Sequence, residues 1–181
     1  MEMLRADDLE RLIRNVEDFP IEGVVFKDIT TLLTHPGALA SSVTLLEEKT
    51  SDLEFDAIAS IESRGFVFGA VLAAGRNLPL VLVRKPGKLP ADTLSEDYAL
   101  EYGTNTVEMH RDSLPVGSRV LIVDDLVATG GSALAAAKLV EMDGSSVAGA
   151  AFVINLEFLG GRARLEEAGY PVRFLIDVAS E

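Results

Sequence analysis

The stretch VLIVDDLVATGGSALAAAKLVE, from Val120 to Glu141, decides the fold. Four apolar residues lead into Asp124 and Asp125, and a loop of small residues then opens a segment with helical spacing. A buried parallel strand followed by a helix has this pattern, and ligands bind beyond the carboxyl ends of such strands. We therefore expect the two carboxylates to face a binding crevice.

The loop from Ala128 to Ser132 is suited to an anion. Its glycines let the backbone approach a ligand closely, and free N–H groups at a helix start attract negative charge. A Walker loop would need a lysine and a dinucleotide loop would need G-x-G-x-x-G, and neither pattern occurs here. We expect a monoester phosphate; the alternative is that Asp125 caps a turn and the glycines only make a tight connection.

The rest of the chain alternates between strands and helices, which predicts an α/β fold with a mostly parallel twisted sheet flanked by helices. Leu9, Leu12, Ile13 and Val16 share one face of a first expected helix. The segment 86–106 shows neither helical nor strand periodicity of its apolar residues, so we expect an irregular lid there. Strands are expected at 56–61, 78–85, 106–110, 119–125, 146–156 and 172–178, and helices at 38–49, 65–75, 133–143 and 162–168.

Composition limits the function further. The chain has 181 residues, of which 48% are hydrophobic and 25% charged, so a single domain over residues 1–181 is expected. Its 16 basic and 29 acidic residues give a net charge of −13, which argues against a nucleic-acid partner. The absence of cysteine excludes disulfides, thiolate metal sites and cysteine nucleophiles. A charged N-terminal sequence and the lack of a membrane-length apolar run predict a cytoplasmic protein.

The stretch VLIVDDLVATGGS resembles the phosphoribosyl pyrophosphate (PRPP) signature of type I phosphoribosyltransferases. Further similar segments are GVVFKDIT (Gly23–Thr30), ESRGFVFG (Glu62–Gly69), VRKPGKLP (Val83–Pro90) and LEYGTNTVEMH (Leu100–His110). Within the family the chain most resembles the members that use adenine. The resemblance implies the type I phosphoribosyltransferase fold with a flexible lid loop. It also implies a purine salvage enzyme that transfers the phosphoribosyl group of PRPP to adenine, giving AMP and pyrophosphate.

By this resemblance, Asp124 and Asp125 bind the ribose hydroxyls and orient Mg²⁺, which would arrive with PRPP rather than in a protein cage. Arg64 lies in one of the two pyrophosphate loops; its alternative role is a salt bridge to Glu62. The family often has a non-proline cis peptide in that loop, expected here at Ser63–Arg64. The 5′-phosphate would lie on Ala128, Thr129, Gly130, Gly131 and Ser132, and the pyrophosphate on Arg84, Lys85 and Lys88, for which a solvated basic turn is the alternative.

The lid would carry the general acid/base Glu101, with Tyr102 beside it, although Glu96 and Asp97 lie in the same acidic stretch. The adenine would stack on Phe26 and meet backbone groups near Val25, with Leu156 on its other face. Simple core packing is the alternative for Phe26 and Leu156.

Ala128 stands where enzymes for 6-oxopurines usually carry an aspartate, which favours adenine as the base. Two other hypotheses stay open: a PRPP-sensing regulatory protein without catalysis, and a transferase for a different base. The resemblance also implies a homodimer that pairs through the region around Arg64 and Arg84.

Overall fold

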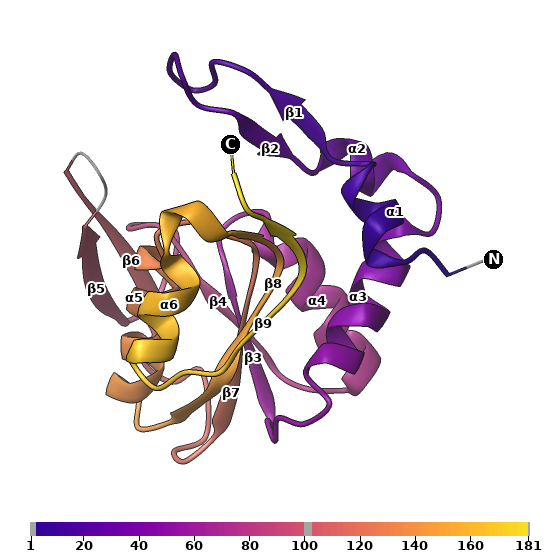
Figure 1. Cartoon of the computed structure of the whole chain (residues 1–181). Coiled ribbons are helices and arrows are strands. Elements are labelled where there is room, and N and C mark those ends of the chain that lie inside the picture. The colour runs from indigo at the N-terminus through magenta and orange to yellow at the C-terminus, as the bar shows by residue number, and fades with distance from the viewer. Residues whose placement is uncertain (1–2, 100–102, 181) are drawn as a thin grey trace.

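A parallel sheet forms the centre of the molecule. The computed structural model describes residues 3–99 and 103–180, and within them five strands lie in the order β4-β3-β7-β8-β9, with every neighbouring pair parallel (Figure 1). Their bounds are β3 (Ala57–Ile61), β4 (Leu80–Val83), β7 (Arg119–Val127), β8 (Ser146–Leu156) and β9 (Val172–Val178). The chain proceeds outward from β3 in one direction and from β7 in the other. The topological switch point therefore falls between β3 and β7.

Helices cover both faces of the sheet, as predicted (Figure 1). One face packs against α3 (Ala38–Lys49) and α4 (Gly65–Arg76), and the other against α5 (Gly131–Met142) and α6 (Gly161–Glu167), which follows the 3₁₀ turn η1 (Glu157–Leu159). Alternate residues of β7 serve the two faces: Leu121 and Val123 pack toward α4, while Val120 and Ile122 pack toward α5. This two-sided burial explains why the strands are continuous apolar runs. No helix in the described residues is long and apolar enough to cross a membrane.

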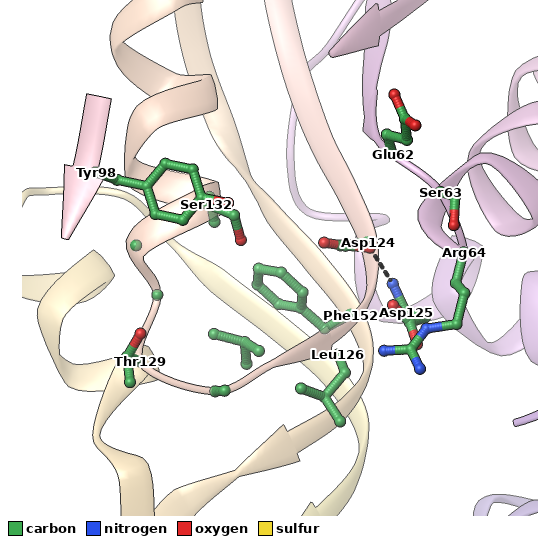
Figure 2. A pocket seen from close by; sticks show the side chains of 15 residues that line it. Glu62, Ser63, Arg64, Tyr98, Asp124, Asp125, Leu126, Thr129, Ser132 and Phe152 are labelled. Atoms are coloured by element: carbon green, nitrogen blue, oxygen red, sulfur yellow. Dashed lines mark hydrogen bonds and ion pairs between the residues drawn. The ribbon is translucent and has the colours of Figure 1, made fainter. Parts of the chain in front are cut away.

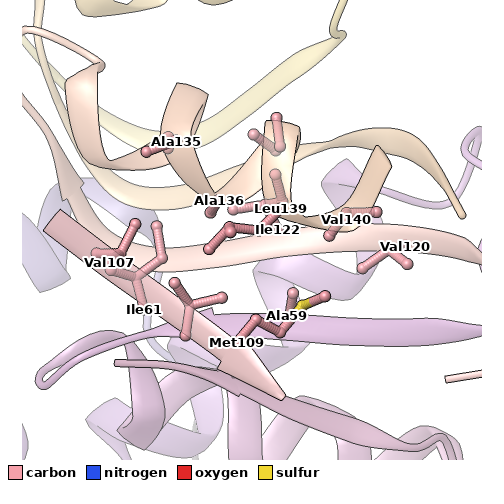
Figure 3. Packing of buried hydrophobic residues seen from close by; sticks show 14 of the residues in the cluster. Ala59, Ile61, Val107, Met109, Val120, Ile122, Ala135, Ala136, Leu139 and Val140 are labelled. Atoms are coloured by element: carbon pink, nitrogen blue, oxygen red, sulfur yellow. The ribbon is translucent and has the colours of Figure 1, made fainter. Parts of the chain in front are cut away.

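The segment expected to be irregular contains a β-hairpin, so that prediction was wrong. Strands β5 (Thr93–Ala99) and β6 (Thr104–His110) pair antiparallel. Figure 3 shows Val107 and Met109 of β6 lying against the sheet and α5, where both are buried. Leu94 of β5 is buried in the same cluster.

Polar partners explain why this acidic sequence still forms strands. Lys138 of α5 donates a hydrogen bond to Glu96 at 2.6 Å, and the Thr106 hydroxyl donates to Asp97 at 2.6 Å. The acids that suggested a solvated loop are therefore paired across the hairpin and to α5. Residues Glu101 and Tyr102, which were assigned to the lid, lie outside the described residues.

The N-terminal region also differs from its prediction. Helix α1 (Ala6–Glu10) ends before Leu12 and Ile13, and Val16 lies in β1 (Arg14–Val16), which pairs antiparallel with β2 (Phe26–Asp28). Leu9, Leu12 and Ile13 all pack on the apolar cluster that α3 and α4 share. Their spacing therefore reflects burial by a short helix and the turn after it. Helix α2 (Thr30–Thr34) connects β2 to α3.

Close packing of α4 on β3 generates a test of the fold. A Cβ on Gly69 would lie 2.7 Å from the Cβ of Ser60, a contact that forces the helix or the strand to move. We expect Gly69→Ala to lower the free energy of unfolding by about 1–3 kcal/mol, measured by urea denaturation.

Gly75→Ala on the same helix is the matched control. Its Cβ would meet only the Glu47 carboxylate at 3.6 Å, so it should raise stability by about 0.5–1 kcal/mol through the lower entropy of the unfolded chain. Equal effects of the two substitutions would contradict the packing described for Gly69.

Candidate active site

A cavity of about 260 Å³ opens at the switch point, where the loops after β3 and β7 meet (Figure 2). Because β3 and β7 are adjacent parallel strands, their carboxyl ends place these two loops side by side. The structure thus brings the predicted ribose, phosphate and Arg64 residues together. The lining consists of Glu62, Ser63, Arg64, Tyr98, residues 124–133 and Phe152.

Two buried carboxylates form the floor of the cavity. Asp124 is 8% exposed and Asp125 is 4% exposed, and the Asp125 N–H donates a hydrogen bond to Asp124 Oδ1 at 2.8 Å. Burial, together with the neighbouring Asp125 charge, raises the pKa of Asp124 well above its usual value. Burial also raises the pKa of Asp125, although the positive charge of Arg64 acts in the opposite direction.

Arg64 joins these carboxylates to the predicted base-binding residues. Its Nε lies 2.8 Å from Asp125 Oδ2. The pair is electrostatic rather than hydrogen-bonded, because Oδ2 is buried without a hydrogen-bond partner among the described residues. The Arg64 guanidinium also lies 5.0 Å from the centre of the Phe26 ring, and Phe19 contacts the same ring edge-on. The alternative pairing of Arg64 with Glu62 is therefore wrong.

Glu62 instead binds the basic cluster that follows β4. Arg84 Nε and the Lys85 N–H each donate to Glu62 Oε2 at 3.1 Å, and Arg84 Nη1 donates to the Lys88 carbonyl at 3.1 Å. Although burial acts to raise it, the pKa of Glu62 is held below its usual value by the Lys85 N–H and the Arg84 charge. Glu62 lines the cavity but Arg84, Lys85 and Lys88 do not, so the basic cluster lies on the side of Glu62 away from the cavity.

One backbone prediction in this loop was misplaced by one residue. The non-proline cis peptide lies at Glu62–Ser63, not at Ser63–Arg64. The loop then enters α4 through Gly65, where a Cβ would lie 2.6 Å from Asp124 Oδ1. Glycine at this position lets the loop after β3 approach the carboxylates closely.

The predicted phosphate loop, from Ala128 to Ser132, also depends on small residues. Gly130 has a φ of 78°, in the left-handed region that favours glycine. A Cβ on Gly131 would lie 3.0 Å from Cδ2 of Tyr98, whose ring stands beside the loop in Figure 2. Hairpin β5–β6 therefore forms one wall of the cavity directly over the loop.

The predicted adenine residues are less well gathered. Val25 and Phe26 are half-buried and do not line the cavity, although Phe26 contacts Arg64, which does. Leu156 is 8% exposed and packs in the apolar cluster on the α3–α4 face, which agrees with its alternative role in the core.

Among the lining residues that sequence reasoning did not assign, Tyr98 and Phe152 come from strands other than β3 and β7. Phe152 stands opposite Asp124 in the parallel register of β7 and β8, so it follows only once strand pairing is known. Tyr98 lies two residues from Glu96 and four from Leu94 along β5. That period of two was the available signal for a strand with one face turned inward.

Comparison with known proteins assigns the class that this fold and cavity define. Residues 28–178 match the family model for a phosphoribosyl transferase domain. Adenine phosphoribosyltransferase of Chloroflexus aurantiacus is 54% identical over 164 residues, covering 91% of this chain and 95% of the relative.

Solved structures agree with this assignment. The crystal structure of adenine phosphoribosyltransferase from Thermoanaerobacter pseudethanolicus has a TM-score of 0.92 and 47% identity, covering 95% of this chain and 99% of that one. The Saccharomyces cerevisiae enzyme, complexed with an imino-altritol bisphosphate and adenine, has a TM-score of 0.86 and 38% identity, with coverages of 94% and 97%. The chain belongs to the adenine phosphoribosyltransferase family.

The raised pKa of Asp124 predicts a conflict between stability and binding. The folded pKa lies above the usual value of 3.8, so the fold loses stability as the pH rises above 3.8, and the loss is complete above the folded pKa. We expect Asp124→Asn to raise the melting temperature by about 3 °C at neutral pH, the shift of about 1 kcal/mol in a domain of this size. The gain in melting temperature should disappear as the pH falls below the unfolded pKa, where the Asp124 carboxyl is protonated in both the folded and the unfolded protein.

The same substitution should weaken PRPP binding by about tenfold to a hundredfold, because a charged hydrogen-bond acceptor is lost. Calorimetric titration with PRPP and thermal melts at several pH values measure both effects. Asp143→Asn is the control, since burial and Asp112 also raise the pKa of Asp143, which lies at the end of α5 outside the cavity lining. It should stabilise without changing PRPP affinity; a loss of stability in Asp124→Asn at neutral pH would contradict the prediction.

Proposed function

We propose that this chain transfers the 5-phosphoribosyl group of PRPP to adenine, forming AMP and releasing pyrophosphate. The bond from C1′ to the pyrophosphate oxygen breaks, a bond from C1′ to a purine nitrogen forms, and the purine loses a proton. The observation that carries the proposal is the convergence of Asp124 and Asp125 with the small-residue loop at the switch point. The adenine specificity rests on relatives that carry that name.

The ribose and its phosphate bind to the loop after β7. Asp124 and Asp125 accept hydrogen bonds from the ribose hydroxyls, and the loop from Ala128 to Ser132 surrounds the 5′-phosphate. Asp125 is the stronger acceptor when it is ionised, and the Arg64 charge favours that state against the effect of burial. Held at both ends, the sugar presents C1′ to the rest of the cavity, so positioning supplies much of the rate gain.

The leaving pyrophosphate requires positive charge. Arg64 borders the cavity, and Arg84, Lys85 and Lys88 stand behind Glu62. In the structure Arg64 pairs with Asp125 and Arg84 with Glu62. Binding of pyrophosphate therefore exchanges carboxylate partners for phosphate partners at both arginines, which stabilises the charge that develops as the C1′ bond breaks.

Magnesium fits this arrangement as a companion of PRPP. Within residues 3–99 and 103–180, no three or more carboxylate, histidine or cysteine side chains converge as a metal cage. Asp124 and Asp125 provide oxygen atoms at the cavity, and Asp125 Oδ2 has no hydrogen-bond partner among the described residues. These oxygens would hold the water shell of the ion, which supplies charge neutralisation on the pyrophosphate.

The base lies against Phe26, with backbone groups near Val25 at its amino edge and Leu156 opposite. Phe26 has one ring face near Arg64, so movement of that guanidinium toward pyrophosphate exposes the ring for stacking. Glu101 acts as general acid/base at the purine imidazole nitrogens, with Tyr102 beside it; these two roles are carried by family resemblance.

Glu101→Gln tests the proton-transfer role. We expect kcat to fall by about 10²–10⁴-fold with the KM values for PRPP and adenine nearly unchanged, as for loss of a general acid/base. Steady-state kinetics at saturating magnesium give the comparison. Glu96→Gln is the matched control, because it removes an acid of β5 whose partner is Lys138. Full turnover by Glu101→Gln would show that another group transfers the proton.

Pyrophosphate release from PRPP with magnesium, measured for adenine, hypoxanthine, guanine and xanthine, tests the reaction itself. We expect release with adenine alone. Release with another base would keep the PRPP site and overturn the base assignment, whereas PRPP binding without any turnover would favour the regulatory hypothesis.

We also propose a cytoplasmic homodimer of single-domain subunits. Leu82 of the edge strand β4 and Val71 of α4 are large apolar side chains that are 37% and 39% exposed. The dimer itself rests on the family resemblance. Light scattering after size-exclusion chromatography should give twice the chain mass. A monomer at working concentration would contradict the proposed dimer.

A further inference from the structure

We infer that Gly161 and Arg164, in the first turn of α6, position the phosphate loop although neither lines the cavity. This inference deepens the proposed function, since it concerns the site of the 5′-phosphate. Both residues come from a segment that the sequence motifs of the family resemblance did not include.

Two hydrogen bonds attach the loop to α6. The Gly161 N–H donates to the Ala128 carbonyl at 2.9 Å, and Arg164 Nη1 donates to the Thr129 carbonyl at 2.7 Å. The two carbonyls belong to consecutive peptide units at the tip of the loop. Each is therefore fixed from outside the cavity by a residue more than thirty positions away in the chain.

Peptide planarity converts these bonds into an orientation for the opposite groups. In a trans peptide the C=O and the following N–H point in opposite directions. Fixing the Ala128 carbonyl on Gly161 turns the Thr129 N–H away from Gly161, and fixing the Thr129 carbonyl on Arg164 turns the Gly130 N–H away from Arg164. Neither N–H donates to a group in the described part of the chain, so both are free for an anion.

The glycine at 161 is explained by this contact and not by its own conformation. Gly161 is the first helical residue of α6 and has no positive φ, so other residues could adopt its backbone. A Cβ there would lie 2.6 Å from the Gly130 nitrogen and would collide with the Ala128 carbonyl. In return, a Cβ on Gly130 would lie 2.9 Å from the Gly161 carbonyl. The two backbones are in direct contact.

Ordinary helix packing does not account for Arg164. Leu165 is fully buried and anchors α6 to the core, whereas Arg164 is exposed. Arg162 on the same helix donates its side-chain hydrogen bond to Glu166 and lies over the Phe174 ring. Arg162 is therefore a matched control for loss of one arginine from α6.

Ribose 5-phosphate is the probe, because it needs the phosphate loop but neither a base nor the pyrophosphate clamp. We expect Arg164→Ala to weaken its binding roughly threefold to tenfold in calorimetry, the effect of one charged hydrogen bond at an exposed position. Arg164→Lys should restore most of the affinity, and Arg162→Ala should leave it unchanged. In kinetics, the KM for PRPP should rise in Arg164→Ala while the KM for adenine stays constant.

Gly161→Ala should lower the affinity for ribose 5-phosphate more than tenfold, because the added methyl group displaces the loop backbone itself. Gly75→Ala controls for the added methyl group. Unchanged binding in Arg164→Ala, or equal losses in Arg164→Ala and Arg162→Ala, would overturn the inference, even if Gly161→Ala does not fold.

The outcome is separable from that of the proposed function. Selective weakening by Arg164→Ala supports the inference whether or not adenine is consumed. Failure of the unmodified protein to bind ribose 5-phosphate would overturn the phosphate site and this inference with it.

Discussion

Two adjacent carboxylates, buried at the carboxyl end of β7, are the constraint on which the rest of the structure depends. Ionised oxygens in such a place are costly unless charge or hydrogen bonds compensate. Here the Asp125 N–H and Arg64, which the loop after β3 supplies, offset only part of that cost, because both pKa values stay raised. That loop reaches the carboxylates because β3 and β7 are neighbours in a parallel sheet and because Gly65 adds no side chain at the contact. Sheet order, glycine placement and charge pairing thus serve one pair of residues.

The remaining charges are arranged as exchangeable pairs. Arg64 with Asp125 and Arg84 with Glu62 keep the cations partnered in a protein whose net charge is −13. Pairs of this kind keep arginines near a cavity without leaving carboxylates uncompensated. The Arg64 guanidinium also contacts the ring of Phe26, so the proposed sugar site and the proposed base site depend on the same side chain. A change at either end therefore affects the other.

Much of this arrangement could be predicted from local sequence. The strands that hold Ala57–Ile61 and Val120–Val123 are buried on both faces, and such apolar runs indicate strands of a covered parallel sheet. The hairpin was missed because Glu96 and Asp97 satisfy their charge through Lys138 and Thr106, partners that only the folded chain brings close. Phe152 could not be assigned to the cavity for a related reason, since its place depends on strand register. Features set by local sequence could be predicted, whereas contacts between distant segments could not.

In the proposed phosphate site, the loop after β7 offers backbone N–H groups rather than a lysine, and this affects how the site can change in evolution. A lysine donor is lost by a single substitution, but a peptide N–H is removed only by proline. Substitutions of side chains in the loop therefore leave these backbone donors in place. The site depends instead on close packing. A side chain at Gly130 or Gly161 would collide with the other backbone, so neither glycine can be replaced by a larger residue without moving the loop. Mutational tolerance in this loop is set by volume, not by charge.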